Sequence, residues 1–217
     1  MTSTPRYPST IATPIEHELI VKKSRFLAHA FPVPSPGDAE ELIAATRKRY
    51  WDANHNCLAL VTGLSGEHAR SSDDGEPSGT AGAPMLDVLR RRDLTDVLVI
   101  VTRYFGGVKL GAGGLVRAYS SATSEALDRV RLVRREVLTQ ATLAVGHADA
   151  GRIDHLLREW ASRHRASLGE SSYAEQTTFE VWLAPHLVGT FTADIAAATG
   201  GALVPVYGAQ RIVDVAA

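Results

Sequence analysis

Cysteine, aromatic residues and long apolar runs are all scarce in this sequence of 217 residues. The one cysteine, Cys57, excludes a disulfide within the chain and a zinc site built from several cysteines. No apolar run approaches the roughly 18–20 residues that span a bilayer, and residues 1–14 lack the apolar core of a signal peptide. These absences predict a cytoplasmic protein without a membrane segment, in which Cys57 is a small buried packing residue.

A large excess of charge of one sign is also missing. The net charge is −1 at pH 7, so the chain as a whole is not a basic protein that coats nucleic acid. Up to Arg135 there are 18 Lys and Arg against 15 Asp and Glu, and from Glu136 onward there are 5 against 9. The composition therefore allows a local basic surface on the first half of the chain.

The first half alternates strand-like and helix-like patterns around a polar stretch. Apolar runs on either side of residues 22–24 predict a hairpin. The segment 63–82 holds too many Gly, Ser and Asp residues to be regular throughout, and residues 1–14 are expected to form a loose arm. Strands are predicted at 15–21, 25–33, 55–62 and 95–102, and helices at 38–50, 83–91 and 113–131.

A change of pattern near residues 131–136 predicts a charged hinge between two domains, at 15–134 and at 135–217. The element order expected in the second domain, β-α-β-β-α-β, is that of a ferredoxin-like split unit. The fold class is therefore α+β with two domains. In the second domain, strands are predicted at 137–145, 166–173, 176–183 and 202–213, and helices at 151–163 and 185–199.

The strongest functional signal is a glycine-rich stretch between a buried strand and a helix. Glycine permits positive φ and close backbone approach, and the free N–H groups at the start of the following helix favour an anion. Arg103, Lys109 and Arg117 would add positive charge, and Tyr104 or Phe105 can stack on a base. The candidate phosphate-binding residues are Arg103, Tyr104, Phe105, Gly106, Gly107, Lys109, Gly111, Gly113, Gly114 and Arg117. The alternative is tight strand–helix packing without a ligand, because the cluster matches neither the Walker pattern nor the dinucleotide fingerprint.

Carboxylates cluster in the polar segment that precedes this stretch. Asp73, Asp74 and Glu76 supply the oxygen ligands that Mg²⁺ prefers, although their spacing is not that of a calcium loop. We favour a structural role, in which these side chains pair with Arg103 and Lys109 and order the loop. No metal and no cofactor is therefore assigned.

Other polar residues are expected to support the site. Lys23 and Arg25 lie beside an aromatic residue, which suits either a phosphate backbone with a stacked base or an exposed hairpin. His55 has the chemistry of a general base, but no nucleophile accompanies it. No catalytic constellation is found, so we expect a binding protein rather than an enzyme. The supporting residues are Lys23, Arg25, His55, Asp73, Asp74, Glu76 and Thr80.

Several of these motifs stand in the order seen in the YigZ/IMPACT family, which the sequence resembles. The matching motifs are 23–26, 55–56, 72–77, 79–82, 102–107, 109–111 and 113–119. The resemblance implies a first domain similar to the second domain of ribosomal protein S5, with helices on one side of a mixed sheet. It also implies a ferredoxin-like second domain similar to domain V of elongation factor G. The resemblance implies an aromatic residue in many relatives at the position of Leu58, and this departure is expected to affect packing more than function.

Both implied folds point toward translation and RNA. The resemblance therefore implies a non-enzymatic binding protein that acts in translation or its regulation and contacts RNA or a ribosome-associated partner. Eukaryotic relatives are linked to a translation-regulating stress kinase through a protein partner. Two alternatives remain open: a nucleotide- or phosphometabolite-binding protein or enzyme that uses the glycine-rich loop and an acidic Mg²⁺ site, and a protein-interaction adaptor.

Overall fold

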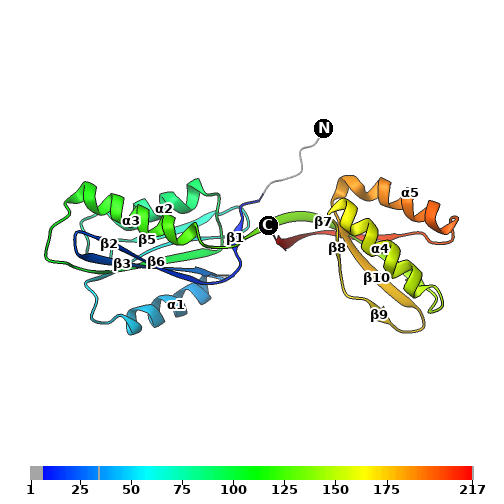
Figure 1. The fold of residues 1–217 in the computed structure, drawn as a ribbon, viewed down its shortest axis with the longest axis horizontal. Helices are drawn as coiled ribbons and strands as arrows, with labels where there is room; N and C mark the ends of the chain where they lie inside the picture. The colour runs from blue at the N-terminus through cyan, green and yellow to red at the C-terminus, as the bar shows by residue number, and fades with distance from the viewer. Residues whose placement is uncertain (1–6, 34, 217) are drawn as a thin grey trace. The chain divides into compact units, whose positions relative to one another are not determined.

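Two separate sheets organise the chain in the computed structural model, which describes residues 7–33 and 35–216 (Figure 1). The chain divides into a first unit, Tyr7–Arg135, and a second unit, Glu136–Asp214, each with a core of its own. None of the helices in the described residues combines the length and the apolar composition of a membrane-spanning segment.

The first unit is built on a five-stranded antiparallel sheet in the order β2-β3-β6-β4-β5. Its strands are β2 (Ile15–Val21), β3 (Ser24–Pro32), β4 (His55–Thr62), β5 (His68–Ser72) and β6 (Val97–Tyr104). Lys22 and Lys23 both have positive φ and form the two-residue turn between β2 and β3. The predicted hairpin is therefore confirmed.

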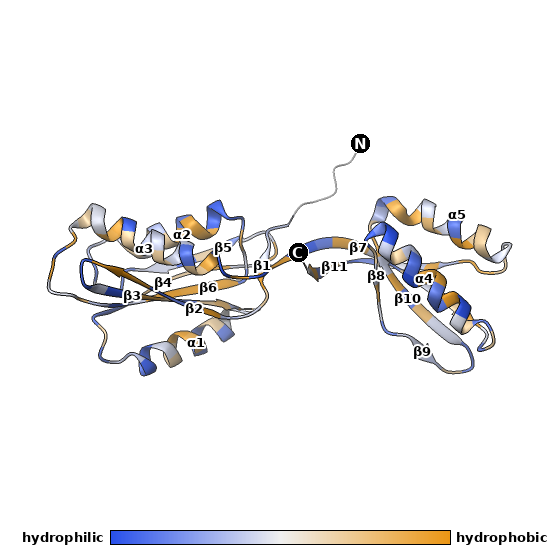
Figure 2. Ribbon diagram, viewed as in Figure 1, coloured by the Kyte–Doolittle hydropathy of each residue, from blue (hydrophilic) through white to orange (hydrophobic). Residues whose placement is uncertain are grey.

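Side-chain alternation gives this sheet two buried faces. Along β6, Val97, Val99 and Val101 face one core, whereas Leu98 and Ile100 face the other. The result is the continuous apolar strand drawn in orange in Figure 2. The helices of this unit are α1 (Pro36–Arg49), α2 (Gly82–Arg91) and α3 (Ala112–Leu127).

The helices lie on both faces of the sheet, with α2 and α3 on one side and α1 on the other (Figure 1). The resemblance implied helices on one side of a mixed sheet. Both features are wrong, because α1 covers the second face of the sheet and all of its strand pairs are antiparallel. Strand β5 lies within the segment 63–82 and was missed, since most of its side chains are exposed and show no apolar alternation. Helix α3 ends at Leu127 instead of 131.

The N-terminal segment is held in place from Ser9 onward, where Ser9 N–H donates to Asp93 O, and this corrects the expectation of a loose arm for this part of residues 1–14. Strand β1 (Thr10–Ile11) pairs antiparallel with Leu132 and Val133, the first residues of β7. Ile11 is buried in the core of the first unit, so apolar burial holds the segment in place. Residues 1–6 lie outside the described residues. The division between the two units falls between Arg135 and Glu136, inside the segment 131–136 where the sequence changes pattern, and this part of the chain belongs to β7 from Leu132 onward.

The sheet of the second unit places β7 between β11 and β10, and β8 and β9 both pair with β10. Helices α4 and α5 contribute Trp160 and Phe191 to a core with Leu143 and Phe179. The strand predicted at 166–173 is divided into two short pieces, β8 and β9. The elements are β7 (Leu132–Val145), α4 (Ala150–His164), β8 (Ser167–Leu168), β9 (Ser172–Tyr173), β10 (Thr177–Leu183), a 3₁₀ turn (Pro185–Leu187), α5 (Val188–Thr199) and β11 (Val206–Ala216).

Replacing Leu98 with alanine is expected to lower the free energy of unfolding of the first unit by about 2–5 kcal/mol, because it opens a cavity in the core under α1. Urea unfolding monitored by circular dichroism measures this change. Ile20 on β2 is 64% exposed and provides the control, because Ile20→Ala should shift the same free energy by no more than about 0.5 kcal/mol. Equal losses in the two variants would contradict the assignment of Leu98 to a packed core.

Candidate functional site

The end of strand β6 carries an arginine whose charge is neutralised inside the protein. Arg103 Nη1 donates to Glu76 Oε1 at 2.6 Å, and Arg103 Nη2 donates to Ser24 Oγ at 3.4 Å. Arg103 is 5% exposed and Glu76 is 8% exposed. The expectation that Arg103 offers an open surface charge to a phosphate is therefore corrected, because the guanidinium forms a buried ion pair. The expected pairing of a loop carboxylate with a basic residue is confirmed for Arg103, whereas Lys109 forms no ion pair within the described residues.

The same carboxylate also receives a hydrogen bond from helix α3. Tyr119 OH donates to Glu76 Oε1 at 2.8 Å, and Cys57 Sγ lies 3.4 Å from the Tyr119 hydroxyl. Burial raises the pKa of Cys57 to about 12 and raises the pKa of Tyr119 well above its usual range. Both groups therefore stay protonated at neutral pH, and Cys57 is the buried packing residue that the sequence predicted.

Asp73 organises the loop 73–82 that carries Glu76. Its carboxylate accepts hydrogen bonds from the backbone N–H groups of Gly79, Ala81 and Gly82, at 2.8, 3.0 and 2.8 Å. Burial by itself would raise the pKa of Asp73, but these three donors outweigh it, and the pKa is lowered. The loop is thus folded around an ionised carboxylate.

The remaining supporting residues strengthen the same loop. Asp74 Oδ2 accepts from the backbone N–H of Asn56 at 2.6 Å, and His55 Nδ1 lies 2.9 Å from the carbonyl oxygen of Asp74. Thr80 Oγ1 donates to the carbonyl oxygen of Pro77 at 2.6 Å. The three acidic residues therefore have separate partners. Across residues 7–33 and 35–216, no group of three or more His, Cys, Asp or Glu side chains is placed to hold a metal ion.

The glycines of the stretch 106–114 have different roles. A Cβ on Gly106 would lie 2.0 Å from the carbonyl carbon of Lys23, so the close approach of the β2–β3 turn requires glycine here. Gly107 and Gly111 have φ of 83° and 73° with open space around them, so their backbone conformation is the reason for glycine. Gly106 is therefore a packing residue, whereas the other two shape an exposed loop.

A pocket of about 370 Å³ opens where this loop enters α3, and we call it the α3 pocket. Helix α3 begins after Gly111 without a side-chain cap, and its first helical hydrogen bond runs from Leu115 N–H to Gly111 O. The N–H groups of residues 112–114 thus have no partner within the helix. Arg103 Nε is buried and has no hydrogen-bond partner within the described part of the chain. The lining residues are Glu76, Pro77, Arg103, Phe105, Lys109, Leu110, Gly111, Ala112 and Leu115.

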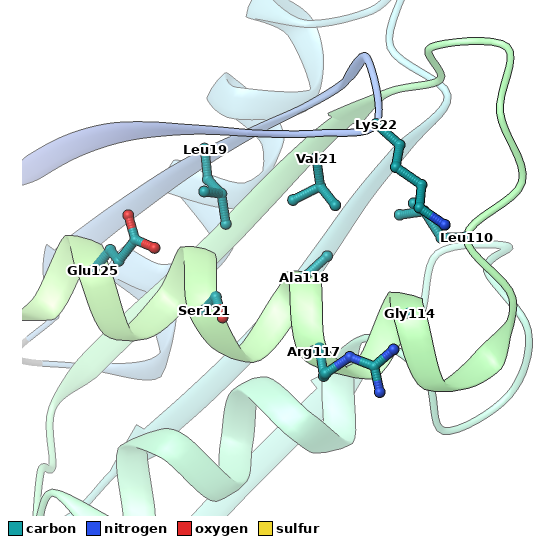
Figure 3. Close-up of a pocket in the computed structure, with 9 residues that line it drawn as sticks. All are labelled: Leu19, Val21, Lys22, Leu110, Gly114, Arg117, Ala118, Ser121 and Glu125. Atoms are coloured by element: carbon teal, nitrogen blue, oxygen red, sulfur yellow. The ribbon is translucent and has the colours of Figure 1, made fainter.

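Several predicted site residues lie elsewhere. Arg117 and Gly114 line a different groove, on the side of α3 that faces β2 (Figure 3). Tyr104 directs its hydroxyl to Asp52 at 2.8 Å, and the Arg25 guanidinium carbon lies 5.6 Å from the centre of the Tyr104 ring. Lys23 occupies the β2–β3 turn.

The sequence did not identify Ser24 and Tyr119 as site residues, although both lie within the motifs that match the family. Ser24 hydrogen-bonds to Arg103, and Tyr119 hydrogen-bonds to Glu76. Tyr119 is four residues after Leu115, so its spacing is typical of an apolar packing position on a helix. It also missed Leu110 and Leu115 as apolar walls of the α3 pocket. No pattern in the sequence distinguishes these leucines from ordinary core residues.

Fold and site together define a two-unit α+β protein whose first unit holds a pocket at an uncapped helix terminus. The family model described as Impact N-terminal domain matches residues 22–127. The chain is 40% identical over 186 residues to the IMPACT family member YvyE of Bacillus subtilis, covering 86% of this chain and 84% of that protein. It is 32% identical over 198 residues to the IMPACT family member YigZ of Escherichia coli, with coverage of 90% and 94%. The chain belongs to the IMPACT family.

A solved structure is similar to this chain in sequence and in fold. It is described as the crystal structure of a hypothetical protein and is 31% identical in sequence to this chain. It covers 93% of this chain and 97% of its own length, with a TM-score of 0.59. The similarity therefore extends over both units of the chain.

The Glu76→Gln variant is expected to lose about 3–5 kcal/mol of unfolding free energy, because it leaves the Arg103 charge buried without a counter-charge. The double variant Glu76→Leu/Arg103→Met should lose less unfolding free energy than the sum of the losses in the two single variants. A double-mutant cycle measured by urea unfolding tests this. Arg70→Ala removes the exposed pair with Glu40 and is the control, with an expected loss below about 1 kcal/mol. A Glu76→Gln loss no larger than that of Arg70→Ala would contradict the role of the ion pair.

Cys57 is expected to resist an aromatic disulfide reagent at pH 8 in the folded protein and to react at once in denaturant. The reason is that the thiol is fully buried and its raised pKa leaves almost no thiolate at that pH. The absorbance of the aromatic thiolate that the reagent releases gives the rate of the reaction. Rapid reaction of the native protein would contradict the burial of the Cys57 thiol.

Proposed function

We propose that this chain is a non-enzymatic, cytoplasmic binding protein that acts in translation or its regulation and that it binds single-stranded RNA in the α3 pocket. One observation carries the proposal. An uncapped helix terminus, an exposed lysine and an exposed aromatic ring share one small pocket. This combination meets the two chemical requirements of a nucleotide, which are an anion site and a face for stacking.

The phosphate is bound at the start of α3. The backbone N–H groups of residues 112–114 have no partner within the helix, and the helix dipole adds roughly half a positive charge at this end. Residues 112 and 113 are exposed, and glycine at 113 leaves the backbone open to a phosphate oxygen. Lys109 is exposed and lines the same pocket, so its ammonium group adds a mobile positive charge.

The base stacks on Phe105. This ring is 46% exposed, and the Arg103 guanidinium carbon lies 5.6 Å from its centre, which supports the ring from the buried side. Pro77, Leu110 and Leu115 provide apolar walls. A volume of about 370 Å³ is near the lower end of ligand pockets and suits one nucleotide.

Charge balance favours this interpretation over a nucleotide enzyme with an acidic Mg²⁺ site. Glu76 is bound to Arg103 and Tyr119, and Asp73 is bound to three backbone N–H groups. Asp74 is bound to Arg47 and to the backbone N–H of Asn56. None of the three carboxylates is free for a cation, and Lys109 and the helix terminus supply the positive charge at the pocket. The net result is attraction of an anion without the need for a metal ion.

The second unit supports a role in translation through its topology. The spatial order β11-β7-β10-β8, with α4 and α5 as the helical connections, is compatible with a ferredoxin-like fold similar to domain V of elongation factor G. For the first unit we propose a variant of the ribosomal protein S5 domain 2 fold. A fold likeness is an analogy, so the assignment to RNA rests on the α3 pocket.

Replacing Lys109 with alanine is expected to weaken binding of a short labelled single-stranded RNA and to reduce the slope of log K against log salt by about 1, since one phosphate contact is lost. Phe105→Ala should cost about 1–3 kcal/mol of binding free energy through the lost stacking. Filter binding at several salt concentrations measures both effects. Lys48→Ala removes an exposed lysine of α1 outside the pocket and should leave binding unchanged.

Identical binding by wild-type protein and both pocket variants would remove the proposed site. Magnesium-dependent thermal stabilisation by a free nucleotide, without RNA binding, would instead favour the nucleotide-binding alternative. Purified RNA, duplex DNA and a free nucleotide therefore belong in the same series of titrations.

A further inference from the structure

Strand β2 forms one edge of the five-stranded sheet, and a groove lies between this strand and helix α3 (Figure 3). Among the described residues, β2 pairs only with β3. Its outer edge therefore presents backbone N–H and C=O groups that an added strand can pair with. We call this feature the β2 groove, and its volume is about 290 Å³.

The floor of the β2 groove is apolar. Leu19 and Val21 alternate with exposed residues along β2 and point toward α3, where both are half-buried. On the helix side, Ala118 and Gly114 are small, so α3 fills little of the space above the strand. The floor therefore has room for one or two apolar side chains of a ligand.

The two ends of the β2 groove carry opposite charges. Figure 3 shows Lys22 and Arg117 at one end and Glu125 at the other. Glu125 Oε2 is already 2.8 Å from His17 Nε2. Within residues 7–33 and 35–216, neither Lys22 nor Arg117 has an ion-pair partner, and Arg117 is exposed. The positive end is therefore the one that attracts a ligand group.

We propose that the β2 groove binds an extended peptide of a partner protein, which adds as a strand beside β2 and carries an acidic residue two positions from a branched apolar residue. Side chains two positions apart point to the same face of a strand, so both reach the groove together. The carboxylate lies between Lys22 and Arg117, and the apolar side chain covers Leu19 and Val21. Backbone hydrogen bonds to the edge of β2 contribute affinity, and the two side chains contribute specificity.

This site is separate from the α3 pocket, although Leu110 lines both. Arg117, which sequence reasoning placed beside the phosphate, belongs to the β2 groove. The RNA proposal depends on Lys109 and Phe105, whereas the peptide proposal depends on Lys22 and Arg117. The two can therefore fail independently.

The test is selection from a display library of random heptapeptides on the immobilised full chain. The expected result is enrichment of peptides with Asp or Glu two positions from Val, Ile or Leu. The double variant Lys22→Glu/Arg117→Glu should instead enrich Lys or Arg at the acidic position, because the charge at this end is reversed. The control Lys48→Glu/Arg91→Glu makes the same charge change on α1 and α2 and should select the same peptides as wild type.

Fluorescence anisotropy then compares an enriched peptide with the same peptide carrying lysine at the acidic position, and the lysine form should bind at least about tenfold more weakly. The proposal is overturned if no sequence is enriched, or if wild type and the charge-reversed variant select the same peptides. A dimer in sedimentation that the charge reversal dissociates would also overturn it, since a second copy of this chain would then occupy the groove.

Discussion

The buried ion pair between Arg103 and Glu76 connects three parts of the first unit that are distant in the sequence. Arg103 ends the central strand β6, Glu76 lies in the loop 73–82, and Tyr119 of α3 donates to the same carboxylate. A buried charge is costly unless it is paired and hydrogen-bonded, so the loop must close on the strand and the helix must start where its tyrosine reaches the carboxylate. The α3 pocket exists because these three parts meet.

This arrangement decides where positive charge is available. Because Glu76 neutralises Arg103, the guanidinium supports Phe105 from within and does not attract anions from solvent. Anions are therefore attracted by Lys109 and by the free N–H groups at the start of α3, which are exposed beside the Phe105 ring. On the other side of α3, Lys22 and Arg117 form a second positive site with an apolar floor. The helix thus separates two surfaces with different chemistry.

Elements with a strong local signal were predicted well from the sequence. Strand β4 was predicted at its observed bounds, 55–62, because burial on both faces makes 57–61 an uninterrupted apolar run. Strands β1 and β5 were missed, since one has two residues and the other is an exposed edge strand. The glycine-rich stretch was identified, and four of its candidate residues line one pocket. The pairing of Arg103 with a carboxylate of the loop was predicted, but the burial of that pair was not, because it depends on how the strand, the loop and helix α3 pack together.

The most direct test of the account is an amide NMR titration of the labelled protein with a short single-stranded RNA. If RNA binds in the α3 pocket, the largest shift changes fall on residues 105–115, and the backbone N–H groups of residues 112–114 move most, because these donors contact the phosphate. Changes confined to the second unit, or none at RNA concentrations that saturate filter binding, would contradict the assignment of the α3 pocket as the RNA site.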